Sequence, residues 1–151
     1  MKYALREMAI SDIDEVIKGE TSIFGESLGF DMLYQELTLN PYAHYFVLEI
    51  NKKVAGYIGV WIEAEHSEII NFYVLEKYQS MGFGSMMLEF VIALVKSCNC
   101  ENISLEVRVS NIRAQKLYQK YGFKESHRRK EYYSNHEDAI VMILEVGKWL
   151  F

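Results

Sequence analysis

A glycine-containing turn between an apolar segment and a helical pattern is the first stretch of this sequence that could do chemistry. It follows the apolar residues 69–74 and comprises Gln79, Ser80, Met81, Gly82, Phe83 and Gly84. A helix that begins at such a turn leaves its first backbone N–H groups unpaired, and these groups attract anions. Gly82 and Gly84 lack a Cβ, so a phosphate ester could approach the backbone closely. The sequence therefore predicts a diphosphate cradle, with a turn that merely starts a helix as the alternative.

The helix after this turn is indicated by apolar residues at helical spacing, namely Met87, Val91, Leu94 and Val95. Two common phosphate-binding motifs do not fit this stretch. The Rossmann pattern requires a third glycine where this chain has Met87. The P-loop requires a Gly-Lys-Ser/Thr sequence, which does not follow. The cradle is therefore of another type.

Glu106 lies in a segment, 103–107, in which apolar and polar residues alternate. Leu105 and Val107 are expected to face the core, which turns Glu106 to the opposite face of a strand. A carboxylate on that face is a candidate general base. An ordinary polar residue on an exposed strand face is the alternative.

Tyr118 belongs to a predicted helix that Asn111 caps and Gly122 ends. A phenol at this position is a candidate general acid. Because Leu117 and Tyr121 share its side of the helix, a tyrosine that only packs is the alternative.

The composition predicts one globular domain over residues 1–151, because half of the residues are hydrophobic and only one is proline. The N-terminus is too polar for a secretory signal and no apolar run reaches membrane-spanning length, so a cytoplasmic protein without a membrane partner is expected. A net charge of −5 disfavours a nucleic-acid partner. Cys98 and Cys100 are predicted to be free, buried or half-buried thiols, and the histidines show no ligand spacing, so no metal site is expected.

The periodicity of the sequence predicts alternating strands and helices, with Ser11 capping the first helix, Gly19 near its end, a loop over 21–30 and Asp31 capping the second helix. The expected strands are 2–7, 45–50, 54–63, 69–74, 103–107, 123–129 and 139–146. The expected helices are 11–19, 31–39, the one that ends near Ser97, and the one that Asn111 caps. No repeat or linker interrupts this order.

The turn at Gln79 follows the pattern Gln-x-x-Gly-x-Gly, which resembles the coenzyme A pyrophosphate motif of the Gcn5-related N-acetyltransferases (GNAT). Three further segments, 40–47, 105–123 and 137–142, resemble the bacterial ribosomal-protein alanine N-acetyltransferases within that family. The resemblance implies a mixed α/β GNAT fold, a splayed mixed sheet of about seven strands flanked by about four helices. The order of predicted elements agrees with it.

The resemblance also implies roles for individual residues. Glu106 corresponds to the catalytic glutamate, and Tyr118 to the acid that protonates the coenzyme A thiolate. Tyr132 and Tyr133 resemble a tyrosine pair that lines a peptide groove, although a sheet-edge pair remains the alternative. The residues that would bind acetyl-CoA are Phe72, Tyr73, Val74, Gln79, Ser80, Met81, Gly82, Phe83, Gly84, Ser85 and Asn111.

The function that the resemblance implies is transfer of an acetyl group from acetyl-CoA to the N-terminal α-amine of a protein, such as the alanine of ribosomal protein S18. The amine attacks directly with general acid and base assistance, and its pKa of about 8 asks less of a base than a lysine at about 10.4. The loop 24–30 lacks an expected Pro-Trp, which leaves a lysine or small polyamine acceptor as an alternative. A non-catalytic acyl-CoA-binding module is another alternative, and the oligomeric state is not predicted.

Overall fold

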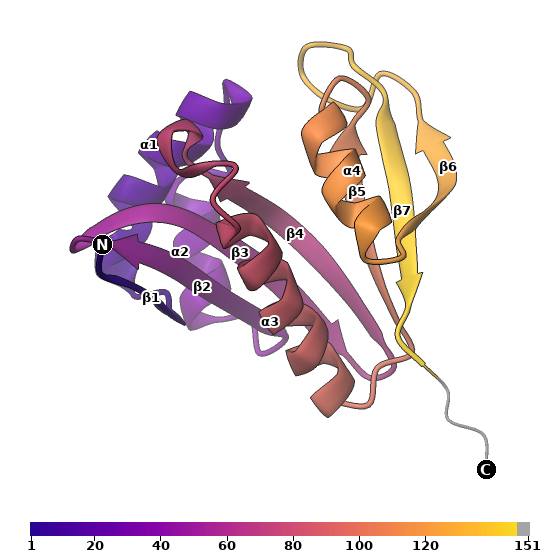
Figure 1. Cartoon of the computed structure of the whole chain (residues 1–151), viewed down its shortest axis with the longest axis horizontal. Helices are drawn as coiled ribbons and strands as arrows, with labels where there is room; N and C mark the ends of the chain where they lie inside the picture. The colour runs from indigo at the N-terminus through magenta and orange to yellow at the C-terminus, as the bar shows by residue number, and fades with distance from the viewer. Residues whose placement is uncertain (148–151) are drawn as a thin grey trace. The chain divides into compact units, whose positions relative to one another are not determined.

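The computed structural model describes residues 1–147, which form a seven-stranded mixed sheet and four α-helices (Figure 1). The strand order is β1-β2-β3-β4-β5-β7-β6, and the elements follow one another along the chain as the sequence predicts. The strands are β1 (Tyr3–Glu7), β2 (Ala43–Ile50), β3 (Lys53–Glu63), β4 (His66–Val74), β5 (Asn102–Arg108), β6 (Lys124–Arg129) and β7 (Ala139–Glu145). The helices are α1 (Ile13–Phe24), α2 (Phe30–Thr38), α3 (Phe83–Ser97) and α4 (Ile112–Lys120). The predicted mixed α/β architecture of about seven strands and four helices is therefore confirmed.

The contacts divide the chain into two compact units, described separately below. The first unit comprises Met1–Trp61 and Asn71–Phe90, and the second comprises Ile62–Ile70 and Val91–Phe151. The single domain over 1–151 stays a prediction, and its last residues, 148–151, lie outside the described part of the chain.

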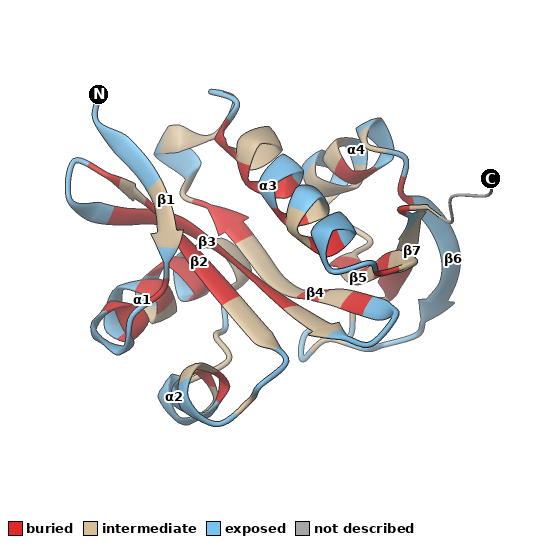
Figure 2. Ribbon diagram, turned by 90° about the horizontal axis from the view of Figure 1, so that it is seen from below, coloured by how far each residue is buried: buried red, intermediate tan, exposed pale blue. Residues whose placement is uncertain are grey.

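The first unit has its core between antiparallel strands and the apolar faces of α1 and α2. The strand β2 pairs antiparallel with both β1 and β3, and most residues of β2 and β3 are buried. Figure 2 shows buried residues running along β2 and β3, and buried positions on one side of each helix. The core side chains include Ile13, Val16, Leu33, Val47 and Tyr57, all fully buried. Burial of such side chains is the main stabilising contribution.

The predicted boundaries of the first two helices are wrong. Ser11 lies in a short 3₁₀ turn and does not cap α1, while α1 passes through Gly19 and ends at Gly25, which has a left-handed φ of 79°. Residues 21–24 are therefore helical and the loop is shorter than predicted. Gly29, not Asp31, is the N-cap residue of α2. The cause at Gly19 is tertiary, because this glycine makes room for a ring.

Gly19 lies against the ring of Tyr73, whose hydroxyl donates a hydrogen bond to the carbonyl of Val16 at 3.2 Å. A Cβ on residue 19 would lie 2.0 Å from that hydroxyl. We expect Gly19→Ala to lower the free energy of unfolding by about 1–3 kcal/mol, although alanine is the better helix former. Urea denaturation measures the change, with Thr21→Ala on the exposed side of α1 as control. A more stable Gly19→Ala protein would contradict this packing.

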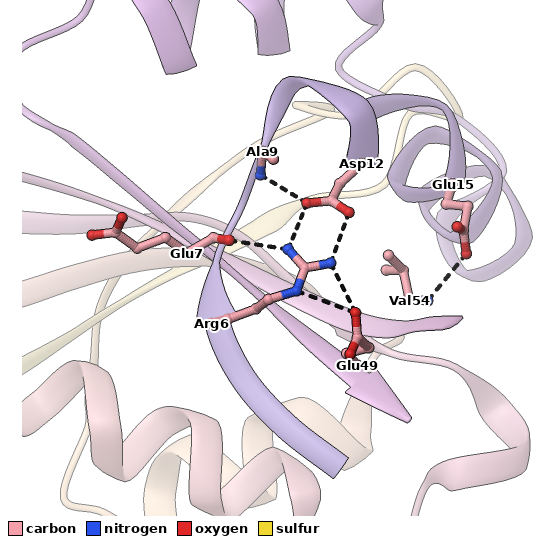
Figure 3. Close-up of polar contacts among 7 residues, drawn as sticks. All are labelled: Arg6, Glu7, Ala9, Asp12, Glu15, Glu49 and Val54. Carbon is pink, nitrogen blue, oxygen red and sulfur yellow. Dashed lines mark hydrogen bonds and ion pairs between the residues drawn. The ribbon is translucent and has the colours of Figure 1, made fainter. Parts of the chain in front are cut away.

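Asp12 has a different role from the cap that the sequence places at its neighbour Ser11. Its carboxylate accepts two hydrogen bonds from Arg6 and one from the Ala9 backbone N–H (Figure 3). The Arg6 hydrogen bonds are 2.8 and 3.0 Å long, and that from Ala9 is 2.7 Å long. Arg6 also donates to Glu49 on β2. The hydrogen bond from Arg6 lowers the pKa of Asp12 below its usual range. This cluster attaches the chain before α1 to the edge of the sheet.

Glu20 is a fully buried carboxylate in the first unit. The hydroxyl of Tyr57 and the amide of Asn71 donate to its Oε2, and the backbone N–H of Leu28 donates to its Oε1 at 3.4 Å. Burial raises the pKa of Glu20, an effect that the hydrogen bonds from Tyr57 and Asn71 oppose. One side chain of α1 therefore joins the loop after the helix to β3 and β4.

The raised pKa of Glu20 makes stability depend on pH. The pKa of Glu20 is higher in the folded chain than its value of about 4.3 in the unfolded chain, so the folded state holds this proton to a higher pH. The contribution of Glu20 to the free energy of unfolding is therefore largest below a pH of about 4.3 and decreases as the pH rises. We expect the free energy of unfolding of Glu20→Gln to increase relative to that of the natural chain as the pH increases from about 4 to 7, because the glutamine has no proton to lose. Urea unfolding at several pH values tests this, with exposed Glu7→Gln as control. A difference between Glu20→Gln and the natural chain that is independent of pH would contradict it.

The second unit is built on β5, whose residues Ile103, Leu105 and Val107 are buried while the residues between them are half-buried. It pairs antiparallel with β7, β7 pairs antiparallel with β6, and β4 pairs with β5 in parallel from His66 to Ile69. The predicted two-faced strand is therefore confirmed. Both cysteines are free as predicted, but Cys98 is exposed and only Cys100 is buried.

Candidate active site

The predicted diphosphate turn is formed in the first unit, directly before α3. Ser80 and Gly82 both have left-handed backbones, with φ of 63° and 88°. The side chain of Gln79 donates to the carbonyl of Val74 at 2.9 Å, which ties the turn to the end of β4. Apart from Gly82 and its two chain neighbours, no described residue has an atom within 4 Å of where a Cβ on Gly82 would be. The turn thus has the open backbone that a diphosphate group requires.

The other residues of this turn differ in their burial and in their position relative to α3. Met81 is half exposed, whereas Phe83 is buried and packs edge-to-face on Tyr3 with ring centroids 5.2 Å apart. Gly84 and Ser85 lie in the first turn of α3, where an anion benefits from the helix dipole. Phe83 therefore anchors the turn, and backbone groups around it are the candidate ligands.

The predicted pantetheine segment, Phe72 to Val74, is the last part of β4 in the first unit. The backbone N–H of Phe72 donates to the side-chain oxygen of Asn71 at 3.0 Å. The side chain of Tyr73 is buried, so only its backbone could serve a ligand. The carbonyl of Tyr73 would lie 2.7 Å from a Cβ on Gly56, so Gly56 lets β3 approach closely here.

Glu106 lies in the second unit, on the half-buried face of β5. Its Oε1 accepts a hydrogen bond from the hydroxyl of Tyr132 at 3.3 Å, and its Oε2 lies 3.0 Å from Nε of Arg129. Oε2 is shielded from solvent and accepts no hydrogen bond of good geometry from residues 1–147. The carboxylate is thus held in place and retains capacity to accept a proton.

Tyr132 and Tyr133 follow β6 in a loop whose shape is fixed by ion pairing. Nη1 of Arg108 lies 3.3 Å from Oε2 of Glu137. The guanidinium carbon of Arg108 lies 4.4 Å from the ring centroid of Tyr133. A hydrogen bond from Asn135 lowers the pKa of Glu137 to about 2, assisted by Arg108. Burial and the charge of Glu106 raise the pKa of Tyr133 to about 12. The structure therefore brings this pair beside Glu106.

Tyr118 is almost fully buried in the second unit, with its ring 5.6 Å from that of Phe123. Burial, and to a smaller extent Tyr133, raise the pKa of Tyr118 well above its usual value. The hydroxyl therefore keeps its proton at neutral pH. Asn111 caps α4 as predicted, accepting a hydrogen bond from the Ala114 N–H at 3.2 Å.

Two charged residues near Glu106 were not identified from the sequence. Arg129 on β6 pairs with Glu106, with Nε 3.0 Å from Oε2, while its side chain stays half exposed. Glu68 on β4 is half-buried, and burial followed by the charge of Glu106 raises its pKa, while Arg129 lowers it. The sequence does not single out Glu68, because it is one of several polar residues at the start of β4, beside His66 and Ser67.

Two findings concern other kinds of site. Within residues 1–147, no group of three or more His, Cys, Asp and Glu side chains is placed to hold a metal ion. No helix in this part of the chain combines the length and apolarity needed to span a membrane.

Known proteins resemble this chain in both sequence and fold. The profile of the Acetyltransferase (GNAT) family matches residues 10–123. A Bacillus subtilis (strain 168) protein, provisionally named ribosomal protein bS18-alanine N-acetyltransferase, is 39% identical over 148 residues, covering 97% of this chain and 98% of that protein. An N-alpha-acetyltransferase of Sulfurisphaera tokodaii is 32% identical, over 93% of this chain and 92% of that protein.

A solved structure agrees with these relatives. The crystal structure of the ribosomal-protein-S18-alanine N-acetyltransferase from Escherichia coli matches with a TM-score of 0.87 at 25% identity, covering 99% of each chain. GNAT acetyltransferases take their acetyl group from acetyl-CoA. The chain therefore belongs to the GNAT acetyltransferase family, and its activity is that of an acyltransferase.

Proposed function

We propose that this protein transfers the acetyl group of acetyl-CoA to the N-terminal α-amine of a protein, with the alanine terminus of a ribosomal protein as the first candidate acceptor. The observation that carries the proposal is the environment of Glu106. One of its oxygens is shielded from solvent, and the other accepts a hydrogen bond from Tyr132, whose ring packs on that of Tyr133. Relatives named for the same reaction, which this chain matches over nearly its full length, support it.

The acceptor side of the reaction falls to the second unit. An N-terminal ammonium has a pKa of about 7.7–8.0, so a carboxylate acting through one water suffices to remove its proton. Glu106 is the proposed base, and the exposed ring of Tyr132 with its partner Tyr133 is the proposed wall for the peptide.

The donor side is proposed for the turn before α3 and the end of β4. Backbone groups of 79–85 would hold the diphosphate of acetyl-CoA, residues 72–74 its pantetheine arm, and Asn111 a further contact. The bound thioester supplies an activated acetyl group. Tyr118 is the proposed donor of a proton to the departing thiolate, because its hydroxyl stays protonated at neutral pH.

Mass spectrometry of peptides incubated with acetyl-CoA and the purified protein tests this function. The panel holds peptides that begin with Ala-Arg, the same peptides with a blocked terminus, peptides with internal lysine, and polyamines. Acetylation of the free α-amine alone is expected. Labelling only of lysine or of a polyamine would refute the N-terminal function, and coenzyme A binding without any product would favour the binding module.

A cytoplasmic location belongs to this proposal, since ribosomal proteins are made there.

A further inference from the structure

Arg129 and Glu106 form an ion pair of unequal partners in the second unit. The side chain of Arg129 is 53% exposed, whereas that of Glu106 is 19% exposed. The carboxylate is thus fixed in the fold, while the guanidinium extends from β6 and has solvent beside it. An ion pair with one half-exposed partner contributes little free energy, so another cation can replace it readily.

Two further groups make the surroundings of Glu106 a place for a cation. The ring centroid of Tyr132 lies 5.6 Å from the guanidinium carbon of Arg129, and its hydroxyl donates to Glu106. Glu68 adds a second carboxylate, whose pKa responds to the charges of both Glu106 and Arg129. Arg129 pairs with Glu106 alone among these contacts, and the nearby charge of Glu68 adds to the negative potential that a cation meets there.

We propose that Arg129 is a positioning residue that holds the Glu106 carboxylate in the resting protein and is displaced from it by the ammonium group of the acceptor. This inference rests on the proposed N-terminal function, in which the acceptor arrives as a cation and loses its proton at Glu106. The incoming ammonium carries the same charge as the guanidinium and has three donors for the same oxygens. Exchange of one cation for the other avoids leaving a shielded carboxylate unpaired.

The charged and titratable groups around Glu106 come from several elements of the second unit. Glu68 is on β4, Arg129 is on β6, and Tyr132 and Tyr133 are in the loop before β7. The residue opposite Glu106 on β7 is the apolar Val141. A second cation, Arg108 on β5, lies over the ring of Tyr133 and pairs with Glu137, so Arg129 is the cation that pairs with Glu106 among these groups.

Arg129→Gln tests the exchange, with Arg128→Gln as a matched control. Arg128 is the neighbouring residue on β6, has the same charge, and lies 3.5 Å from Glu125 instead of Glu106. In Arg129→Gln we expect the KM for the acceptor peptide to fall about two- to fivefold, because the competing cation is gone. We also expect kcat to fall and the acidic limb of the kcat/KM profile to move to higher pH, because the Glu106 carboxylate loses the cation that pairs with it.

Arg129→Lys should restore the acidic limb, since it keeps the charge. Arg128→Gln should leave all three quantities unchanged. The inference is overturned if Arg129→Gln behaves like Arg128→Gln, or if its acceptor KM rises while the acidic limb stays in place.

A second measurement does not need turnover. In ¹⁵N-edited spectra, the Nε–H signal of Arg129 should move when Glu106 is replaced by Gln and when alanine amide is added as a free ammonium ligand. The Arg128 signal should not move. If no peptide is acetylated, the N-terminal function is refuted. If the Arg129 Nε–H signal does not move in Glu106→Gln, the ion-pair exchange itself is refuted.

Discussion

Glu106→Gln is expected to lower kcat by about 10²–10⁴-fold while leaving the affinity for coenzyme A unchanged. The amide keeps the volume of the side chain and the hydrogen bond that Tyr132 donates to Oε1, but it cannot accept a proton from the acceptor ammonium. The proposed donor site is formed by other residues, so binding of coenzyme A should not depend on the carboxylate. Steady-state kinetics with an Ala-Arg peptide and isothermal titration with coenzyme A measure the two quantities.

The loss of turnover in Glu106→Gln should depend on pH, because it comes from the missing base and not from a change in the fold. A higher pH supplies more neutral amine, so the deficit of Glu106→Gln should shrink above a pH of about 8. Glu125→Gln on β6, an exposed carboxylate in the same unit, serves as control and should retain full turnover. Equal turnover of Glu106→Gln and the natural chain at neutral pH would remove Glu106 from the role of base.

Tyr118→Phe is expected to lower kcat by about 10²–10⁴-fold as well. The thiol of coenzyme A has a pKa near that of cysteine, about 8.5, so its thiolate leaves more easily when a phenol donates to it. Burial raises the pKa of Tyr118, which keeps the proton on the hydroxyl and makes its complete transfer less favourable. A hydrogen bond that strengthens as the thiolate forms is therefore the larger part of the expected effect.

The effect of Tyr118→Phe has to be separated from loss of packing, because this ring is almost fully buried against Phe123. Phenylalanine keeps the ring, so the midpoint of thermal unfolding should change little while turnover falls. Tyr121→Phe at the end of α4 removes a hydroxyl from the same helix and should leave kcat unchanged. If an acyl donor with a much more acidic thiol restored none of the lost rate, the hydroxyl would not act on the leaving group.

Neither substitution is expected to abolish activity. Binding of acceptor and thioester together supplies up to roughly 7–11 kcal/mol of the lowered barrier, and this contribution does not require an acid or a base. The double substitution of Glu106 and Tyr118 should therefore still acetylate peptide faster than free acetyl-CoA does in solution.

Local patterns were sufficient where a residue and its neighbours decide the conformation. Asn111 was predicted to cap α4 and does so, because the cap is formed within one turn. The alternation 103–107 predicted the two faces of β5, and the helical spacing from Met87 predicted α3. Gly82 adopts the left-handed backbone expected of a glycine in a tight turn.

Helix ends were less predictable, because partners distant in the sequence decide them. Gly19 reads as a helix end, yet α1 continues for five further residues since this glycine accommodates the ring of Tyr73. Asp12 binds Arg6, so a typical cap sequence at Ser11 forms a 3₁₀ turn instead.

The sequence by itself determined the order of strands and helices, the position of the glycine-containing turn before α3 and the face of β5 on which Glu106 lies. Each of these depends on periodicity, glycines or caps, which act over a few residues. The tertiary structure decided the environment of the functional groups: the ion pair of Glu106 with Arg129, the proximity of Glu68, and the complete burial of Glu20. Charges shift the pKa of their neighbours through space, and separate strands bring these side chains together. No local pattern encodes such distances.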